Sequence, residues 1–264
     1  MSVKATLFFG RSFKIIIGKE YNVSVEGTQE EKDTVTSKIS SNGVVITQKT
    51  GNIINSGSFN LNNIAGRNGR ISINGSNISI SGNSIYINNG NIVGGTSDKS
   101  STLDITVTVP ELVSVEMETN GLYENINLGD VGNLVVSNKS SSDVYFSTAN
   151  DATIHIQGSG SVIGQNTKNA KFSIQGSGNI KVENVIGITN ATVQGSGNIK
   201  VKNGCFMSPT INVMGSGDVK LNGKVTGDIN ANVMGSGDIK VTIVGEHVGN
   251  IHKNKMGSGS ITIK

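Results

Sequence analysis

The tripeptide Gly-Ser-Gly recurs through the second half of this 264-residue chain at nearly regular intervals. Its first glycine stands at positions 158, 176, 195, 215, 235 and 257, so successive copies begin 18, 19, 20, 20 and 22 residues apart. A period of this length is too short for a repeat of two helices and matches one turn of a β-solenoid. Because such turns bury a shared core only when stacked, the repeat constrains the fold more than any other feature.

The residues that follow each Gly-Ser-Gly fall into columns when the six copies are aligned. A polar residue comes first, then an apolar residue, then in the second to fifth copies a lysine and another apolar residue, as in "GSGNIKV" at 195–201. Alternate residues of a strand face opposite sides, so the apolar columns are predicted to point inward and the Asn/Asp and Lys columns outward. We interpret Gly-Ser-Gly as the corner of each coil, where a bend with positive φ and close stacking both favour glycine.

The composition supports an all-β chain with a narrow core. Only 35% of the residues are hydrophobic, whereas 35 are glycine and none is tryptophan. We expect three parts: N-terminal β-strands packed on the solenoid (1–50), an Asn/Gly/Ser-rich β insertion (51–100), and the β-helix itself (101–264), with regular coils from about residue 120. The predicted fold class is therefore an all-β parallel β-helix built from coils of 18–22 residues.

The run "ITVTVPELVSVEM" at 105–117, followed by the serial "GSGNIKV" and "GSGDIKV" coils, resembles the auto-transporter adhesin head GIN domain family. The resemblance covers residues 103–264 and extends to 21–48, whereas 51–96 departs from it. It implies a right-handed β-helix and a binding role, with no catalytic residues to carry over. The Asn-rich segment also resembles versions of the domain in tailed phages, which implies a virion-associated role as one alternative.

The lysine column is the most distinctive predicted surface. Ammonium groups about 5 Å apart in water repel by roughly 0.9 kcal/mol per adjacent pair before screening, which a fold tolerates. Two interpretations stay open: the column maintains solubility and discourages edge pairing with other chains, or it binds a phosphorylated or acidic ligand. The residues of this candidate site are Lys181, Lys200, Lys220 and Lys240.

Irregular segments offer a second candidate site, because loops on a rigid scaffold are free to encode specificity. Arg67 and Arg70 lie amid Gly and Asn in the insertion. Their guanidinium groups fit a carboxylate or a phosphate, although exposed loop arginines are commonly just solvated.

Catalytic and metal chemistry find little support in the sequence. Asp218 and Asp238 each stand two positions from a lysine on the same predicted face, which favours ion pairs over calcium binding or acid–base work. The histidines (His155, His247 and His252) do not cluster with acids or with the single cysteine, Cys205, as zinc ligands would. We therefore expect no enzyme activity, no cofactor and no metal.

The partner classes are bounded by charge and hydropathy. A net charge of +3 without a basic cluster, and only 7 Phe and 4 Tyr, argue against nucleic acid. No apolar run approaches a membrane span, and "LFFGRSFK" at 7–14 is too broken for a signal peptide. We therefore expect a cytoplasmic protein, with the cytoplasm of a host cell or a virion as alternatives.

The last strand, "GSITIK", has no obvious polar cap, so we expect a homo-oligomer. Two functions stay open: an adhesin-like or virion-associated module that contacts a macromolecule, and an intracellular binder that holds a small anionic ligand at an oligomer interface.

Overall fold

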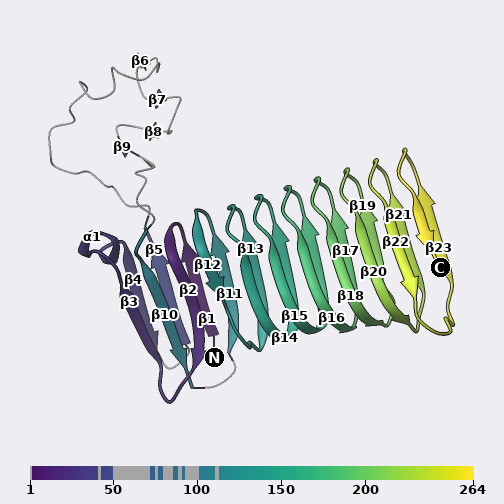
Figure 1. The fold of residues 1–264 in the computed structure, drawn as a ribbon, viewed down its shortest axis with the longest axis horizontal. Helices are drawn as coiled ribbons and strands as arrows, with labels where there is room; N and C mark the ends of the chain where they lie inside the picture. Colours follow the sequence, from purple (N-terminus) through teal and green to yellow (C-terminus); the bar gives the residue numbers. More distant parts are fainter. Residues whose placement is uncertain are drawn as a thin grey trace.

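The structure is a computed structural model that describes residues 2–40, 43–49, 101–110 and 113–264, and the backbone alone of 72–74, 77–79, 86–88 and 91–92. The described chain forms an elongated parallel β-solenoid with coils about 20 residues apart (Figure 1). The predicted solenoid is therefore confirmed.

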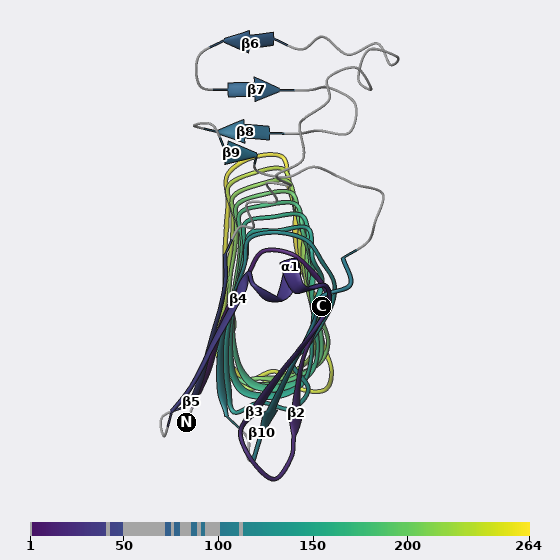
Figure 2. The same ribbon diagram turned by 90° about the vertical axis from the view of Figure 1, so that its left-hand side faces the viewer.

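Each coil contributes one strand to each of two facing sheets, which we call wall 1 and wall 2 (Figures 1 and 2). In spatial order, wall 1 contains β4 (Val35–Ser40), β5 (Gly43–Gln48), β1 (Ser2–Leu7), β11 (Ser114–Thr119), β13 (Asn133–Asn138), the second halves of β14 (Val144–Ile156) and β15 (Val162–Ile174), β17 (Thr189–Val193), β19 (Thr210–Val213), β21 (Ile229–Val233) and β23 (Ile251–Lys255). Wall 2 contains β3 (Asn22–Glu26), β10 (Asp104–Val109), β2 (Gly10–Ile17), β12 (Tyr123–Asn127), the first halves of β14 and β15, β16 (Ile180–Gly187), β18 (Ile199–Phe206), β20 (Val219–Val225), β22 (Ile239–Ile243) and β24 (Ile261–Ile263).

The core lies between the two walls and is built from in-register columns. Inward positions alternate with outward ones along the strands, as the buried and exposed residues of β16 and β17 show. Each fully buried Val, Ile or Phe contributes about 1.5–3 kcal/mol, so stacked columns compensate for the narrow core. One such column of wall 2, with no exposed surface, consists of Val162, Ile180, Ile199, Val219 and Ile239.

The Gly-Ser-Gly corners need glycine because stacked backbones approach closely. A Cβ at Gly197 would lie 1.8 Å from the carbonyl oxygen of Gly178, and a Cβ at Gly178 would lie 1.9 Å from that of Gly160. Among the glycines of the six copies, Gly257 alone has positive φ, at 121°. The expectation that the bend itself requires positive φ was therefore wrong for the first five copies, where close packing between coils is the reason for glycine.

The N-terminal strands belong to the solenoid and do not lie beside it. β1 and β2 form a coil between the β5–β10 coil and the β11–β12 coil, and every one of these contacts is parallel and in register. The solenoid therefore begins well before residue 120, and the expectation of a separate packed region was wrong for these strands. The proposed boundaries at residues 50 and 100 stay a prediction.

The N-terminal end of the solenoid is closed by a short crossing segment. β3 and β4 are antiparallel to β10 and β5, and helix α1 (Gln29–Lys32) joins them across the open end (Figure 2). No helix in the described ranges is long and apolar enough to cross a membrane.

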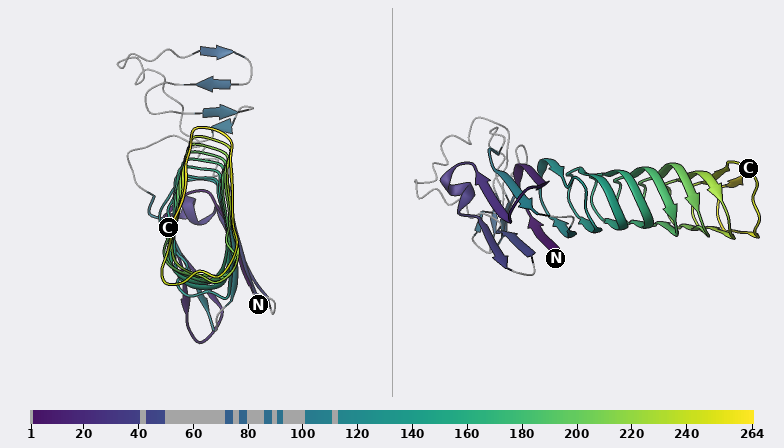
Figure 3. Two further views of the ribbon diagram at one scale, coloured as in Figure 1. Left: turned by 90° about the vertical axis from the view of Figure 1, so that its right-hand side faces the viewer. Right: turned by 90° about the horizontal axis from the view of Figure 1, so that it is seen from below.

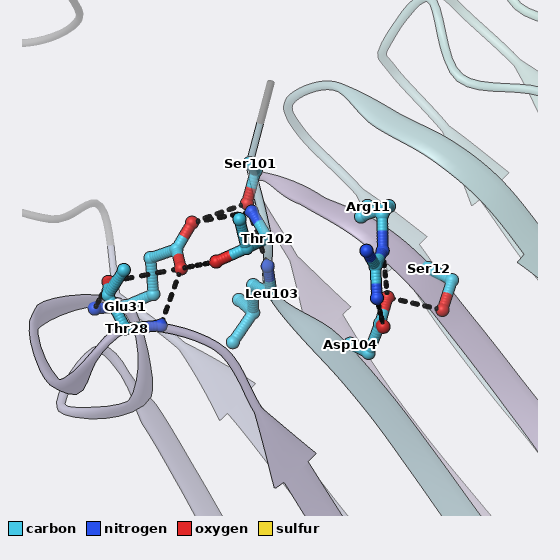
Figure 4. Close-up of polar contacts among 8 residues, drawn as sticks. All are labelled: Arg11, Ser12, Thr28, Glu31, Ser101, Thr102, Leu103 and Asp104. Carbon is cyan, nitrogen blue, oxygen red and sulfur yellow. Dashed lines mark hydrogen bonds and ion pairs between the residues drawn. The ribbon is translucent and has the colours of Figure 1, made fainter. Parts of the chain in front are cut away.

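Glu31 of α1 forms hydrogen bonds that connect this segment to Ser101 and Thr102, just before β10 (Figure 4). Its carboxylate accepts hydrogen bonds from the Ser101 hydroxyl at 2.8 Å, from the Thr102 hydroxyl at 2.7 Å and backbone N–H at 3.0 Å, and from the Thr28 N–H at 2.9 Å. Partial burial raises the pKa of Glu31, but these hydrogen bonds outweigh that effect and lower it to about 2.

Four short strands form a second sheet. β6 (Ser72–Asn74), β7 (Asn77–Ser79), β8 (Tyr86–Asn88) and β9 (Asn91–Ile92) pair as an antiparallel sheet of four short strands.

The views from the C-terminal end and from below show the coils of the solenoid stacked along a single axis (Figure 3).

Candidate functional site

The four lysines predicted to form a column do stand in register on wall 2. Lys181 pairs with Lys200, Lys200 with Lys220, and Lys220 with Lys240, on β16, β18, β20 and β22. All four are exposed. We call them the lysine ladder. Its three intervals of about 4.8 Å span about 14 Å along the solenoid axis.

The lysine ladder lies within the wall and not at its edge. Each of its strands is paired on both sides, and the last strand of wall 2 is β24, where Thr262 follows Lys240 in register. These lysines therefore cannot protect a free strand edge, and that part of the first interpretation was wrong.

Two further lysines widen the positive face. Lys202 and Lys224 lie on β18 and β20, at exposed positions that follow the ladder residues of the same strands. Lys202 pairs with Glu183 at 2.8 Å, and Lys220 pairs with Asp218 at 3.0 Å. In the described part of the chain, Lys181, Lys200, Lys224 and Lys240 have no ion-pair partner within 4.0 Å.

The polar column beside the ladder holds the coils together. The side-chain oxygen of Asn198 accepts the backbone N–H of Asp218 at 2.9 Å, and that of Asp218 accepts the N–H of Asp238 at 3.0 Å. Asp238 in turn accepts the N–H and the hydroxyl of Ser260, both at 2.8 Å. Asp218 and Asp238 were expected to form ion pairs with lysine, and Asn198 was expected only to face outward. The recurrence of Asn, Asp or Ser after each Gly-Ser-Gly was the sequence signal for this structural role.

Asp218 combines both roles. Burial raises the pKa of its carboxyl group, but the N–H of Asp238 and the Lys220 ammonium lower it by more, so the pKa lies below its ordinary value. The predicted pairing of Asp218 with lysine is confirmed. The corresponding pairing of Asp238 is not found, because the carboxylate of Asp238 is directed to Ser260.

The ladder column continues toward the N-terminus with uncharged side chains. Ile163 pairs with Lys181, and Tyr145 pairs with Ile163. The Tyr145 side chain is 40% exposed, so its ring is accessible to a partner at the N-terminal end of the lysine ladder.

The outer face of wall 1 is polar with few charges. Its central column carries Thr153, Lys171, Asn190, Thr210, Asn230 and His252. Neighbouring coils are linked there by amide ladders, such as that from Asn232 to Asn212 at 2.9 Å.

The other sequence candidates do not assemble into a site. Arg67 and Arg70 lie outside the described residues. Cys205 is a half-buried residue in register with Ile186 and Lys224, and the His247 ring lies 2.9 Å from the carbonyl oxygen of Gly227. Within the described ranges, no three His, Cys, Asp or Glu side chains gather as metal ligands.

A shallow, open depression lies near the C-terminal end. It is lined by Lys224, Val225, Thr226, Val244, Gly245, Glu246 and Val248. Its lining contains no nucleophile and base arranged for catalysis.

In the coil formed by β23 and β24, lysines stand at core positions on wall 1 only. In β23, Lys253 pairs with Ala231 and Lys255 with Val233, so lysines occupy positions that are buried and apolar in the coil before. In β24, Ile261 and Ile263 continue the apolar columns of Ile239 and Val241. Lysines thus replace core residues on wall 1, whereas β24, the strand expected to lack a polar cap, does continue the apolar columns of wall 2.

Comparison with known proteins places this geometry in a family. A family model described as "Putative auto-transporter adhesin, head GIN domain" matches residues 51–244. The match includes the Asn-rich segment at 51–96, which the motifs alone had left outside the resemblance. No match was found among curated proteins.

Several solved structures share the fold. A "putative adhesin" from Parabacteroides distasonis aligns with a TM-score of 0.59 at 14% identity, over 100% of this chain and 92% of that one. A "putative lipid binding protein" from the same organism aligns with a TM-score of 0.56 at 19% identity, over 100% and 92%. A "putative adhesin" from Parabacteroides merdae aligns with a TM-score of 0.56 at 13% identity, over 100% and 91%.

At these identities the solved structures establish the fold alone. The family model covers 194 of the 264 residues, counting from 51 to 244 inclusive. On that match, together with its Gly-Ser-Gly solenoid, the chain belongs to the auto-transporter adhesin head GIN domain family.

Proposed function

We propose that this protein is a non-enzymatic, adhesin-like binding module that contacts a macromolecular partner through the outer face of a wall. The observation that carries the proposal is the stacking of exposed side chains in register over successive coils, which makes a long, regular surface. Such a surface suits an extended partner better than a small molecule, which needs a concave pocket.

The size of the walls supports contact with a macromolecule. Among the described residues, wall 2 has eleven strands and therefore ten intervals. At about 4.8 Å per interval and roughly 20 Å of strand length, its outer face measures on the order of 1,000 Å². A standard protein interface buries about 800 Å² per partner, so one wall suffices for specific binding.

The family and the solved structures support the same class of function. The family description names an adhesin, and two of the structures reported above are also described as adhesins. One neighbour is described as a lipid binding protein, which is a statement about that protein. We therefore favour surface recognition over catalysis.

Face-directed substitutions test the proposal. The purified protein is immobilised and exposed to a panel of polysaccharides, matrix proteins and lipid vesicles, with binding followed by interferometry. One variant carries Thr153→Arg and Asn190→Arg on wall 1, and the other carries Lys200→Glu and Lys220→Glu on wall 2. We expect at least one panel member to bind, and only one of the two variants to lose that binding while both keep the wild-type unfolding temperature.

Two results would overturn the proposal. One is a folded protein that binds no macromolecule in the panel. The other is saturable binding of a small phosphorylated compound with a pocket shared between subunits, which would favour the alternative of an oligomeric small-anion binder. A homo-oligomer stays a prediction, checked by light scattering on the same sample.

A further inference from the structure

The lysine ladder has a role that solubility alone does not explain. Its strands lie inside wall 2, so the four ammonium groups do not guard an edge. Like charges are instead aligned at the interval of the coils, where they repel one another. A column of alternating positive and negative side chains would keep the protein equally soluble without this repulsion.

Among the described residues, ion pairing neutralises one of the four ladder lysines, Lys220. Asp218 pairs with Lys220, and Glu183 pairs with the neighbouring Lys202. Asp238 directs one carboxylate oxygen to the N–H and the hydroxyl of Ser260. The C-terminal half of wall 2 thus carries more ammonium groups than carboxylates, along one straight line.

A linear polyanion matches this geometry. The ladder presents one ammonium group per coil, so its charges repeat at about 4.8 Å in a straight row parallel to the axis. A chain that carries regularly spaced anionic groups places them between successive lysines and relieves their mutual repulsion. A folded acidic protein has no reason to match a straight, equally spaced row.

The flanking residues favour a sugar polymer over a nucleic acid. The next column on the same face contains the amides of Asn179 and Asn198, the carboxylates of Asp218 and Asp238, and the Ser260 hydroxyl. Such groups form hydrogen bonds with sugar hydroxyls. Tyr145 offers one exposed ring at the N-terminal end of the column, two coils from Lys181. Single-stranded nucleic acids are commonly held by several stacking rings, and this column presents one.

From these observations we infer that the lysine ladder binds an anionic polysaccharide, lying along the solenoid axis with its carboxylate or sulfate groups on the ladder. The inference rests on the proposed function and names the partner class for wall 2. Ion pairing supplies the attraction, and Tyr145 packs against a sugar ring at one end. Such binding weakens as salt is raised, because the exposed charges are screened.

The test uses the full-length protein with four defined probes. Heparin supplies sulfates and carboxylates, hyaluronan supplies carboxylates alone, dextran is the uncharged control, and single-stranded DNA is the control for unspecific polyanion binding. The ladder variant changes Lys181, Lys200, Lys220 and Lys240 to Gln. The matched control changes the same number of exposed lysines elsewhere to Gln, at Lys19, Lys38, Lys168 and Lys171.

We expect the wild type and the matched control to bind heparin or hyaluronan with Kd values within twofold of each other. The ladder variant should bind at least tenfold more weakly, with unchanged thermal unfolding, and Tyr145→Ala should weaken binding by a smaller factor. Comparison of heparin with hyaluronan then shows which anionic group is recognised.

Three results would overturn the inference. The ladder variant and the matched control lose the same affinity, or DNA binds as tightly as the polysaccharides, or the protein binds other macromolecules of the panel but neither anionic polysaccharide. The last result leaves the proposed function standing, whereas a folded protein that binds no macromolecule at all refutes both.

Discussion

Substitution of a single corner glycine by alanine tests the stacking argument most directly. The change is Gly197→Ala, in an interior coil. The new Cβ would lie 1.8 Å from the carbonyl oxygen of Gly178, whereas real Cβ atoms essentially never approach a heavy atom within 3.0 Å. The two coils must therefore move apart by more than 1 Å at this corner.

The expected cost follows from that displacement. The corner donates two hydrogen bonds to the Gly176 carbonyl oxygen, from Ser196 at 3.1 Å and Gly197 at 3.3 Å, and each contributes about 0.5–1.5 kcal/mol. Overpacking against a rigid neighbour adds about 1–3 kcal/mol. We expect a loss of about 3 kcal/mol in the free energy of unfolding, which lowers Tm by about 6–12 °C in a chain of this size.

The assay combines thermal unfolding with amide hydrogen exchange, because a solenoid can open locally from one coil. Ser196→Ala is the matched control, since Ser196 is exposed at the same corner and should change stability by less than about 0.5 kcal/mol. Gly259→Ala, in the coil of β23 and β24, should cost less than Gly197→Ala, because among the described residues a neighbouring coil packs on one side only of that corner. The argument fails if Gly197→Ala unfolds within about 2 °C of the wild type with its corner amides still protected.

Three further predictions concern the ends of the solenoid. Glu31 has a pKa of about 2 in the folded protein, against an ordinary value of 4.5, so its stabilisation is full above about pH 5 and disappears as pH falls toward 2. Discounted for partial exposure, this stabilisation amounts to about 1–2 kcal/mol. The free energy of unfolding of Glu31→Gln in urea should therefore be lower than that of the wild type at pH 7 and equal to it near pH 2. A difference that does not change with pH would contradict the role of the Glu31 carboxylate. Gln48 is buried, and its side-chain oxygen accepts hydrogen bonds from the Phe8 N–H at 2.9 Å and the Tyr123 hydroxyl at 3.0 Å. Gln48→Leu leaves these donors unpaired, so it should lower the free energy of unfolding by about 2–5 kcal/mol. A decrease below 1 kcal/mol in urea unfolding would refute this. Lys253→Ala with Lys255→Val copies the core residues of the preceding coil, and sedimentation should show concentration-dependent end-to-end assemblies larger than those of the wild type; an unchanged sedimentation profile would show that these lysines do not limit association.

The repeat region was predictable because its pattern is local. Coils about 20 residues long and strict alternation place Ile180 and Ile199 inward and Lys181 and Lys200 outward, and the structure shows both. No knowledge of distant contacts was needed, since each coil pairs with the next in sequence.

The first coils were not predictable in the same way. β1 is paired with β5 on one side and β11 on the other, more than 35 and more than 100 residues away in the chain. No Gly-Ser-Gly marks these corners. At 140–142 the corner is Ser-Ser-Ser, held by buried hydrogen bonds such as that from the Ser140 N–H to the side-chain oxygen of Asn138 at 3.0 Å. Such polar contacts leave no periodic signal in the sequence.

The polar column beside the lysine ladder was visible in the sequence but was misassigned in role. Asn198 and Asp218 were expected to be surface groups, yet each accepts a backbone N–H from the following coil. That role depends on how one corner stacks on the next, and an alignment of the repeats does not show this stacking directly. A side-chain oxygen at this position satisfies a donor that the bend would otherwise leave unpaired, so Asn, Asp and Ser are interchangeable there.

The two groups of lysines on this solenoid therefore have different roles. Lys253 and Lys255 occupy core-facing positions on the last coil, where another copy stacked end to end would have to bury their charges. They disfavour such stacking on wall 1, whereas the apolar columns of wall 2 continue into β24. The lysine ladder is paired on both sides, and its charges face solvent in the middle of a wall. With edge protection assigned to the last coil, the aligned charges of the ladder are best explained by what they attract.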